Sequence, residues 1–236
     1  MDIDFDKYPL PKRMRHHTAS NLYIPLAELK TRPDYYPPVY DKIDWLEYFA
    51  DSKAPAALDI GCGKGGFLLE YSAQNPDKNV LGIEVRLQPV EWLKAFIEGE
   101  KISNCSILWY SVVNGLNFIE NGTIDSIFYL FPDPWPKQKH HKRRAFNAAF
   151  LDEICRILIP MGKLYLATDV ESVHEYHIET LEKHSGLHFK VITSDDDWRL
   201  PVTNKERFCR AKGIEMYRVV GQLRNSLSPS RLPSVS

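Results

Sequence analysis

The sequence predicts an α/β fold, with one doubly wound sheet of about seven mostly parallel strands and helices on both faces. The first observation behind this prediction is that strand-like and helix-like segments alternate from Ala56 onward. The second is that 236 residues, 44% of them hydrophobic, can supply one sizeable core. The third is a glycine-rich stretch at 59–66, where the first strand passes into the first helix, a place at which such sheets bind ligands. We therefore expect one domain over residues 56–220.

The hydrophobic pattern places the elements in order along the chain. Short apolar runs bounded by turn residues predict strands at 56–60, 80–84, 106–110, 126–130, 163–168, 188–192 and 214–220. Longer segments predict helices at 66–74, 88–98, 114–119, 145–158, 170–184 and 203–212. Residues 1–55 are interpreted as an irregular, basic and proline-rich N-terminal arm in which only 43–50 is helical. The Ser/Pro/Leu-rich residues 221–236 predict a flexible tail.

Composition excludes several classes of protein. No apolar run approaches the ~18–20 residues of a membrane span, and the acidic start, Met1-Asp2-Ile3-Asp4, lacks the basic region of a signal peptide. The four cysteines are scattered without a C-x-x-C pair, so we expect free thiols in a reducing cytoplasm. No metal is expected, because only His174 and His177 share a helical face and no cysteine or carboxylate set completes a shell. The sequence therefore predicts a soluble, cytoplasmic protein without a membrane partner.

Charge is segregated along the chain although the net charge is only −1. One basic cluster lies in the arm and a second follows residue 136. Together they hold the expected contacts to an RNA backbone, which are Arg13, Arg15, Lys139, Lys142, Arg143 and Arg144. Such clusters create a local positive field that attracts phosphate groups. By themselves they are also compatible with solvated basic faces.

The stretch Asp59-Ile60-Gly61-Cys62-Gly63-Lys64-Gly65-Gly66 carries the first chemical signal. Its glycines permit a tight turn and a close approach of a ligand to the backbone. Glu84 ends the next strand 21 residues after Gly63, where a carboxylate can bind both hydroxyls of a ribose. The string also satisfies G-x-G-x-x-G, so NAD, S-adenosylmethionine and a purely structural turn all stay open. Asp59 favours S-adenosylmethionine, because a carboxylate suits a cationic ligand and repels a pyrophosphate.

The second signal is the stretch FPDPWPK at 131–137. Three prolines in seven residues cannot continue a strand or lie inside a helix, so Asp133 and Trp135 are expected on a stiff exposed loop directly after a buried strand. Asp133 can act on a ligand there or serve as a turn residue between two prolines, and its place at the carboxyl end of a strand favours the first role. Trp135 can stack on a base or cap the core.

These motifs together resemble those of the tRNA (guanine-N7)-methyltransferase family. The resemblance covers about residues 56–220 and rests on LDIGCGKGGF, LGIEVR, FPDPWPK with its trailing K-x-x-K-R-R, Thr168-Asp169 and P-V-T-x-x-E at 201–206. It implies a Rossmann-like class I methyltransferase sheet whose last strand is antiparallel, with S-adenosyl-L-methionine as cofactor and tRNA as partner. The implied reaction is methyl transfer to N7 of a guanine, which family resemblance places in the variable loop.

The resemblance also implies roles by position. The residues implied for S-adenosylmethionine binding are Asp59, Gly61, Gly63, Glu84, Val85, Arg86, Ser111, Val112, Leu130 and Asp133. Asp133 is also the implied catalytic carboxylate, and the implied contacts to the tRNA or the target guanine are Lys137, Asp169, Thr203, Asn204, Lys205 and Glu206. Two positions depart from the family pattern: Asp59 stands where Glu is frequent, and Ser111 replaces an Asp or Asn that contacts the adenine. Because a hydroxyl still accepts a hydrogen bond, we expect weaker rather than abolished cofactor binding, which titrating the cofactor against Ser111→Asp would test.

Other interpretations stay open at the level of sequence. A methyltransferase of the same fold could modify another RNA, and a catalytically silent relative could bind RNA alone. The paired carboxylates argue against a silent protein, because a pure RNA binder needs no cofactor pocket. An NAD-dependent dehydrogenase is disfavoured by Asp59. The sequence does not determine whether the protein is a monomer or a homodimer, or which tRNAs are its substrates. No obligate protein partner can be read from it.

Overall fold

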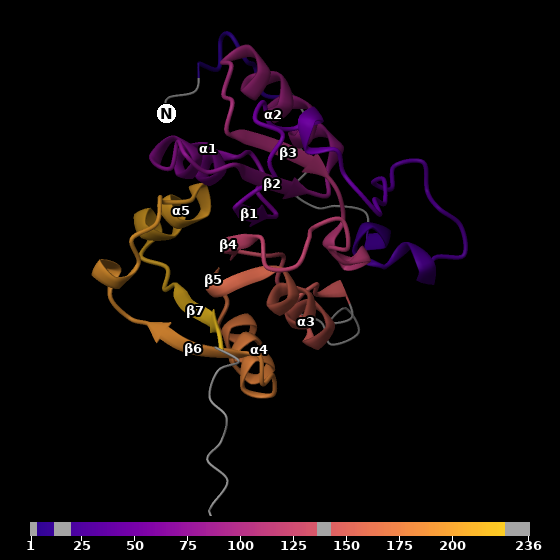
Figure 1. Ribbon diagram of the computed structural model, residues 1–236. Coiled ribbons are helices and arrows are strands. Elements are labelled where there is room, and N and C mark those ends of the chain that lie inside the picture. The colour runs from indigo at the N-terminus through magenta and orange to yellow at the C-terminus, as the bar shows by residue number, and fades with distance from the viewer. Residues whose placement is uncertain (1–3, 12–19, 136–142, 225–236) are drawn as a thin grey trace, which may run out of the picture.

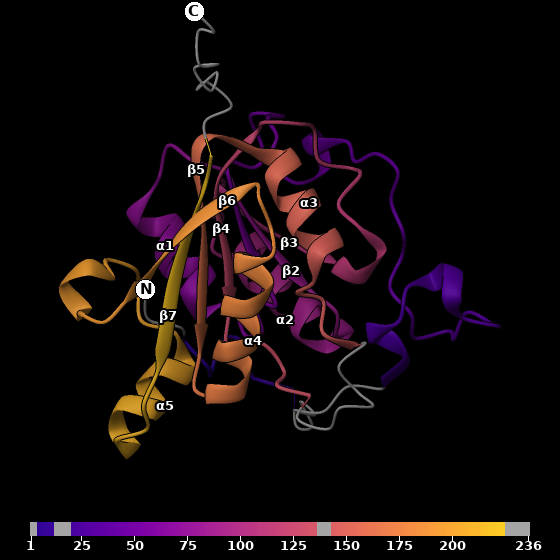
Figure 2. The ribbon, with the colours of Figure 1, turned by 90° about the horizontal axis from the view of Figure 1, so that it is seen from below.

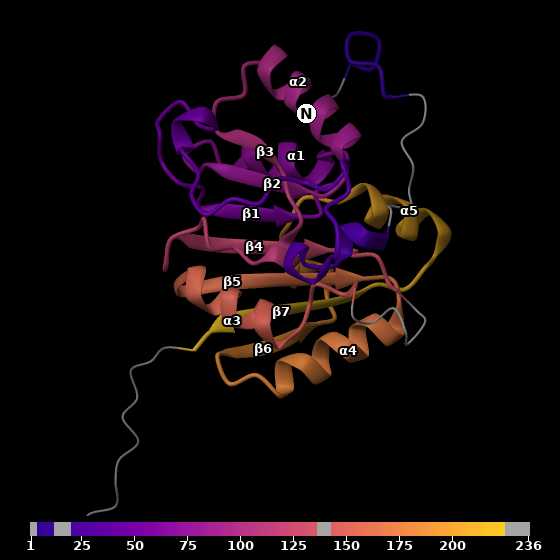
Figure 3. The same ribbon diagram turned by 90° about the vertical axis from the view of Figure 1, so that its right-hand side faces the viewer.

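A computed structural model of the chain describes residues 4–11, 20–135 and 143–224. They contain one seven-stranded sheet in the order β3-β2-β1-β4-β5-β7-β6 (Figures 1 and 3). The strands are β1 (Ala57–Ile60), β2 (Val80–Glu84), β3 (Cys105–Trp109), β4 (Ile124–Leu130), β5 (Leu158–Thr168), β6 (Leu187–Ile192) and β7 (Tyr217–Leu223). Only β7 runs antiparallel to its neighbours, β5 and β6. The predicted sheet, with its antiparallel last strand, is confirmed.

Helices cover both faces of this sheet (Figure 2). Helices α1 (Gly66–Gln74) and α2 (Leu87–Gly99) pack on one face, and α3 (Ala148–Ile157) and α4 (Glu171–Glu182) pack on the other. Helix α5 (Asn204–Lys212) begins beside the start of α1, where a Cβ on Gly66 would lie 3.1 Å from Asn204 Nδ2. Within the described ranges, no helix has both the length and the apolar character that a membrane crossing requires.

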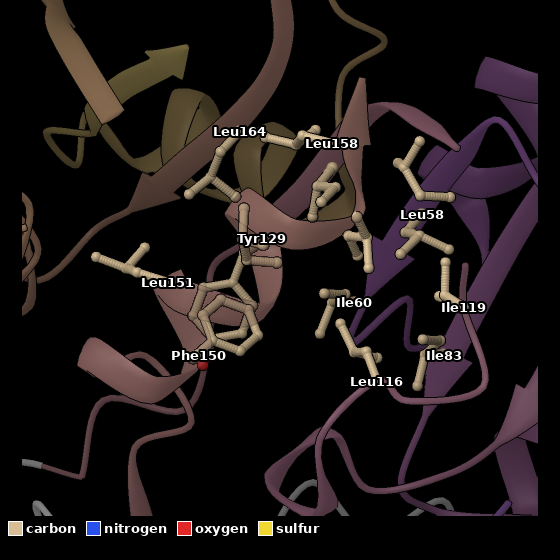
Figure 4. Close-up of a cluster of buried hydrophobic side chains, with 14 of the residues drawn as sticks. Leu58, Ile60, Ile83, Leu116, Ile119, Tyr129, Phe150, Leu151, Leu158 and Leu164 are labelled. Atoms are coloured by element: carbon tan, nitrogen blue, oxygen red, sulfur yellow. The ribbon is translucent and has the colours of Figure 1, made fainter. Parts of the chain in front are cut away.

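Two hydrophobic clusters fill the space between the sheet and its helices. The larger cluster joins Leu58 of β1 and Ile127 of β4 to Leu151 of α3. Figure 4 shows part of it, with Leu58 and Leu151 labelled. The second cluster lies on the opposite face and joins Phe128 of β4 to Leu68 of α1. Successive residues of a strand point to opposite faces, so Ile127 and Phe128 serve different clusters and both are fully buried. This two-sided burial explains why the parallel strands are continuous apolar runs in the sequence.

Two of the predicted helices are wrong. At 114–119 the chain makes only a 3₁₀ turn, Val112–Asn114, and Gly115 then takes a φ of +83°, which no α-helix accommodates. At 43–50 there is only a 3₁₀ turn, Trp45–Glu47. Trp45 and Phe49 nevertheless contact each other, with Phe49 in the larger cluster and Trp45 packed against it, which is a spacing of four residues that an α-helix would also place on one face.

The remaining differences concern the ends of strands. Strand β5 begins at Leu158 rather than at 163, because a bulge lets Ile124 pair with Leu158 while Ser126 pairs with Lys163. Strand β7 begins and ends later than predicted and continues to Leu223, so the assignment of residues 221–223 to a flexible tail is wrong, because they pair with β5 and β6. The predicted tail from residue 225 onward, the arm cluster with Arg13 and Arg15, and the cations Lys137, Lys139 and Lys142 lie outside the described residues.

Candidate active site

A cavity of about 860 Å³ lies at the carboxyl ends of the parallel strands, across the point between β1 and β4 where the strand order reverses. Every residue implied for cofactor binding lines it: Asp59, Gly61, Gly63, Glu84, Val85, Arg86, Ser111, Val112, Leu130 and Asp133. It is also lined by Asp169, Thr203, Asn204, Lys205 and Arg143, which were predicted to contact RNA or the target base. Glu206 and Arg144 are not among the lining residues. Residues distant in the sequence are thus gathered at one edge of the sheet.

The glycine-rich turn between β1 and α1 is shaped by left-handed backbone angles. Gly61, Gly63 and Gly65 have φ of +79°, +58° and +73°. A Cβ on Gly65 would lie 2.4 Å from Leu93 Cδ2, so both the angle and the packing against α2 require glycine there. The amide of Gly61 donates to the carbonyl of Ile83 in β2 at 2.7 Å, which fastens the turn to the neighbouring strand. The turn therefore exposes backbone to the cavity without a side chain in the way.

Glu84 is the anchor of this turn. Its side chain is buried, with Oε2 accepting from the Gly63 amide at 3.0 Å and from Arg86 Nη2 at 3.1 Å. Oε1 accepts from the Arg86 amide at 2.9 Å and from Arg86 Nε at 3.0 Å. A carboxylate has about four acceptor positions, so the four donors fill it. A ribose can bind Glu84 only if the Arg86 side chain gives up its two hydrogen bonds.

Asp59, unlike Glu84, has a carboxyl oxygen without a hydrogen-bond donor among the described residues. Its side chain is 3% exposed, and Oδ2 has no hydrogen-bond partner in the described part of the chain. Burial, followed by the charge of Glu84, raises the pKa of Asp59 to about 8. A buried carboxyl oxygen without a donor costs free energy until a donor or a cation satisfies it. The arrangement is therefore suited to a positively charged ligand in the cavity.

Asp133 projects from the loop that follows β4 and is exposed. The loop leaves the sheet through Phe131, whose amide donates to the Ala167 carbonyl at 2.7 Å. Phe131 and Trp135, on either side of Asp133, have positive φ angles of 52° and 41°. Arg144 connects this loop to α4. Its guanidinium donates to the Pro134 carbonyl at 3.0 Å and lies 4.6 Å from the ring centre of Tyr176.

The two arginines that follow this loop occupy different places. Arg144 is 8% exposed, and burial lowers the pKa of its guanidinium. Arg143 lines the cavity with its guanidinium 5.1 Å from the ring centre of Trp135. Arg143 Nε is buried and has no hydrogen-bond partner among the described residues. Of the two, only Arg143 is in a position to meet a ligand in the cavity.

The start of α5 forms the far wall of the cavity. Thr203 caps the helix, since its Oγ1 accepts from the Glu206 amide at 2.9 Å. Lys205 forms an ion pair with Asp169 at 2.7 Å, which joins α5 to the end of β5. Glu206 points away from the cavity and is 2% exposed, and its Oε1 accepts from Arg218 at 2.6 Å and from Arg210 at 2.9 Å. Glu206 therefore fastens the helix that presents its neighbours.

The arm supplies a cavity residue that the sequence did not reveal. Tyr23, in the 3₁₀ turn Ser20–Tyr23, donates from its hydroxyl to Asp133 Oδ2 at 2.6 Å. Its ring meets Trp135 edge to face, with ring centres 5.0 Å apart. Ser111 is 3% exposed and donates to the carbonyl of Leu22 in the same turn at 2.5 Å. No local signal could have identified Tyr23, because the contact links an irregular arm to a loop 110 residues away.

No group of three or more potential metal ligands is present among the described residues. The four cysteines are free thiols, of which Cys105 and Cys209 are buried. Burial raises the pKa of the Cys62 thiol in the glycine-rich turn, which disfavours the thiolate that a nucleophile needs. The ionisable groups that line the cavity are therefore carboxyl groups, tyrosine phenols, cations and the Cys62 thiol in its protonated form.

Comparison with known proteins places this architecture among methyltransferases. A family model described as "Putative methyltransferase" matches residues 53–219. A tRNA (guanine-N(7)-)-methyltransferase of Streptococcus pneumoniae strain 70585 is 29% identical, over 81% of this chain and 92% of that protein. One of Lactobacillus gasseri is 32% identical, over 65% of this chain and 70% of that protein. A solved SAM-dependent O-methyltransferase of Thermotoga maritima has a TM-score of 0.51 at 14% identity, covering 76% of this chain and 63% of that one, which shows a shared fold alone.

Proposed function

The chain belongs to the tRNA (guanine-N7)-methyltransferase family, and from that premise we propose that it transfers a methyl group from S-adenosylmethionine to N7 of a guanine in tRNA. The observation that carries this proposal is that one cavity is lined by Asp59, whose Oδ2 has no partner among the described residues, by Glu84 and by Asp133. We place the target guanine in the variable loop and the protein in the cytoplasm, where its free thiols would stay reduced.

The residues of the cavity fit S-adenosylmethionine, which supplies an electrophilic methyl group on a sulfonium. Asp59 provides a buried carboxyl to which no described residue donates at Oδ2, and a cationic centre of the cofactor would favour its ionised form and satisfy it. Glu84 provides acceptors for ribose hydroxyls once Arg86 has released them. The same carboxylates oppose a pyrophosphate, which makes NAD the poorer match. The Ser111 hydroxyl donates its hydrogen to the Leu22 carbonyl, so its oxygen can still accept a hydrogen bond from the adenine amino group.

The chemistry of guanine explains why so few groups are needed. Guanine N7 presents an unprotonated lone pair at neutral pH, so the transfer requires no strong general base. The requirement is alignment. Holding the two reactants in line can lower the barrier by ~7–11 kcal/mol. A general base usually contributes roughly 10²–10⁴-fold in rate, which corresponds to only about 3–5 kcal/mol. A rigid loop that fixes the base is therefore more useful than a proton acceptor.

Asp133 meets this requirement. It lines the cavity on a loop fixed at both flanks, and its carboxylate can accept hydrogen bonds from the N1–H and the amino group of a guanine. An adenine lacks the N1–H and would leave the carboxylate unsatisfied. The negative charge would also stabilise the positive charge that develops on the imidazole ring during transfer. We assign Asp133 to orienting and stabilising the base rather than to deprotonating it.

Cations around the cavity supply the RNA contacts of this proposal. Arg143 and Lys205 line the cavity. We assign phosphate contacts to Arg143 and to the basic residues outside the described ranges, and base or backbone contacts to Asp169 and to residues 203–205. Glu206 acts on the substrate only through α5 in this scheme, since its carboxylate is taken by Arg210 and Arg218. Removing one phosphate contact would flatten the salt dependence of tRNA binding without changing base choice.

The decisive experiment incubates the purified protein with labelled S-adenosylmethionine and either bulk tRNA or ribosomal RNA, followed by digestion to nucleosides. We expect N7-methylguanosine from tRNA alone. Asp133→Asn should lose most of the rate and still bind the cofactor, whereas Asp152→Asn, an exposed carboxylate of α3 that does not line the cavity, should match the wild type. Label in ribosomal RNA would favour a different RNA substrate. Cofactor binding without any label would favour a silent relative, and full activity of Asp133→Asn would refute the role of that carboxylate.

A further inference from the structure

Tyr23 holds one oxygen of Asp133 and packs on the loop that carries it. We propose that Tyr23 is a positioning residue for methyl transfer, which orients the Asp133 carboxylate toward the target base. This inference rests on the proposed function, because the orientation of Asp133 matters only if that carboxylate meets a base. It goes beyond the residues implied by the family motifs, since Tyr23 belongs to the arm and to none of them.

The contact between the arm and the loop has two parts. The Tyr23 hydroxyl lies 2.6 Å from Asp133 Oδ2, the length of a strong hydrogen bond to a carboxylate. The Tyr23 ring meets the ring of Trp135 at 5.0 Å and 73°, an edge-to-face arrangement that fixes the phenol laterally. Asp133 and Trp135 lie on the same loop, two residues apart, so these two contacts of Tyr23 span the turn that presents Asp133.

The backbone on both sides of Tyr23 is held by buried side chains, one from the domain and one from the arm. The carbonyl of Leu22 accepts from Ser111 Oγ at 2.5 Å, and the carbonyl of Ile24 accepts from Tyr36 Oη at 2.8 Å. Ser111 and Tyr36 are 3% and 1% exposed. A residue whose two neighbouring carbonyls are fastened to buried side chains has little backbone freedom. Tyr23 is therefore a fixed point from which the exposed Asp133 can be oriented.

The geometry favours positioning over obstruction. Each carboxylate oxygen accepts about two hydrogen bonds, so the Tyr23 hydroxyl leaves acceptor positions on Oδ2 and all of those on Oδ1. Oδ1 accepts no hydrogen bond from the described residues. A guanine needs two acceptors, which the remaining positions supply. Without the phenol, an exposed carboxylate rotates about its own bonds and must lose that freedom when the base binds.

The test replaces Tyr23 with Phe, which keeps the ring against Trp135 and removes only the hydroxyl. With tRNA as substrate we expect kcat to fall about tenfold, as for the loss of a hydrogen bond to a charged group, while KM for tRNA and the Kd of S-adenosylmethionine stay within about twofold. The matched control is Tyr8→Phe, which removes another phenol–carboxylate hydrogen bond of the arm, to Glu100 at 2.8 Å, away from the cavity. That control should retain the kinetics of the wild type.

A second pair of variants separates positioning from a general effect on the fold. In an Asp133→Ala background the carboxylate is absent, so adding Tyr23→Phe should change the residual rate less than about twofold. A tenfold loss in that background would overturn the inference, as would a Tyr23→Phe enzyme that equals or exceeds the wild type. The wild type in the same assay distinguishes the two proposals. If it forms no N7-methylguanosine, the proposed function fails and this inference with it; if it does, only the Tyr23 variants decide.

Discussion

Replacing Asp59 with Asn should flatten the dependence of stability on pH between about pH 4 and about pH 8. The folded carboxyl is buried beside Glu84, and its pKa is raised to about 8 from a value of 3.8. In the unfolded chain it titrates near its ordinary value, about 3.9. Between these limits the folded protein binds one more proton than the unfolded chain, so stability is fully present below the unfolded pKa and is lost as the pH rises through about 8.

The magnitude follows from the distance between the two pKa values. Each pH unit is worth about 1.4 kcal/mol, so about four units correspond to roughly 6 kcal/mol of unfolding free energy. Relaxation around the charged form reduces this value, which makes it an upper bound. Urea unfolding of the wild type from about pH 5 to about pH 9 should therefore show a decline of several kcal/mol that Asp59→Asn lacks. Parallel curves for the two proteins would refute the reasoning.

Cofactor binding gives the same prediction a second readout. If a cationic cofactor favours the ionised form of Asp59, its binding near pH 7 must release close to one proton to the buffer. Calorimetric titrations in two buffers of different ionisation enthalpy measure that proton, and Asp59→Asn should release none. The control is Asp197→Asn, which alters an exposed carboxylate away from the cavity. Equal proton release by the wild type and Asp59→Asn would exclude this carboxyl as the source.

Two further predictions concern stability. Glu206→Gln should lower the free energy of unfolding in urea by about 3 kcal/mol, because the buried Arg218 loses one of its two carboxylate partners. The control Glu179→Gln, in an exposed ion pair, should lower it by less than about 0.5 kcal/mol. Equal losses would contradict the burial argument. Burial, with smaller effects of the charges of His174 and Arg144, lowers the pKa of His177 to about 3. Stability is then lost as the pH falls from about 6.5 toward 3, and His177→Phe should move the midpoint of acid unfolding, followed by far-UV circular dichroism, to lower pH. An unchanged midpoint would show that other groups govern acid unfolding.

The fold was predictable chiefly because its central parallel strands β1 and β2 are buried along their whole length. Strand β2 was placed at its observed ends, since all five of its residues are buried and turn residues flank it. The prediction of a helix at 114–119 was wrong because Gly115 adopts a positive φ. The sequence does not indicate that angle, since glycine in a short apolar segment is also compatible with a negative φ. The bulge that extends β5 was equally hidden, because it depends on pairing between two strands.

The candidate site was predictable only where its residues carry local motifs. Asp59, Glu84 and Asp133 were identified because each lies at or just beyond the carboxyl end of a recognisable strand, at the edge where such sheets bind ligands. The partners of these residues were not identifiable. That Arg86 fills the Glu84 carboxylate, or that Ser111 fastens the arm, depends on side-chain contacts between segments that the sequence does not relate.

The loop that carries Asp133 shows how the structure changes a sequence argument. The sequence attributes its stiffness to three prolines, yet prolines fix only their own φ. Phe131 and Trp135 adopt left-handed angles that cost about 1–2 kcal/mol each and persist only if surrounding contacts hold them. The Phe131 amide is held by the Ala167 carbonyl. Arg144 donates to the Pro134 carbonyl, and the ring of Trp135 contacts Tyr23 and Arg143. The rigidity of the loop therefore depends on arginines of the second basic cluster and on a tyrosine in the arm, so a change at Arg144 or Tyr23 should disturb Asp133 with every proline in place.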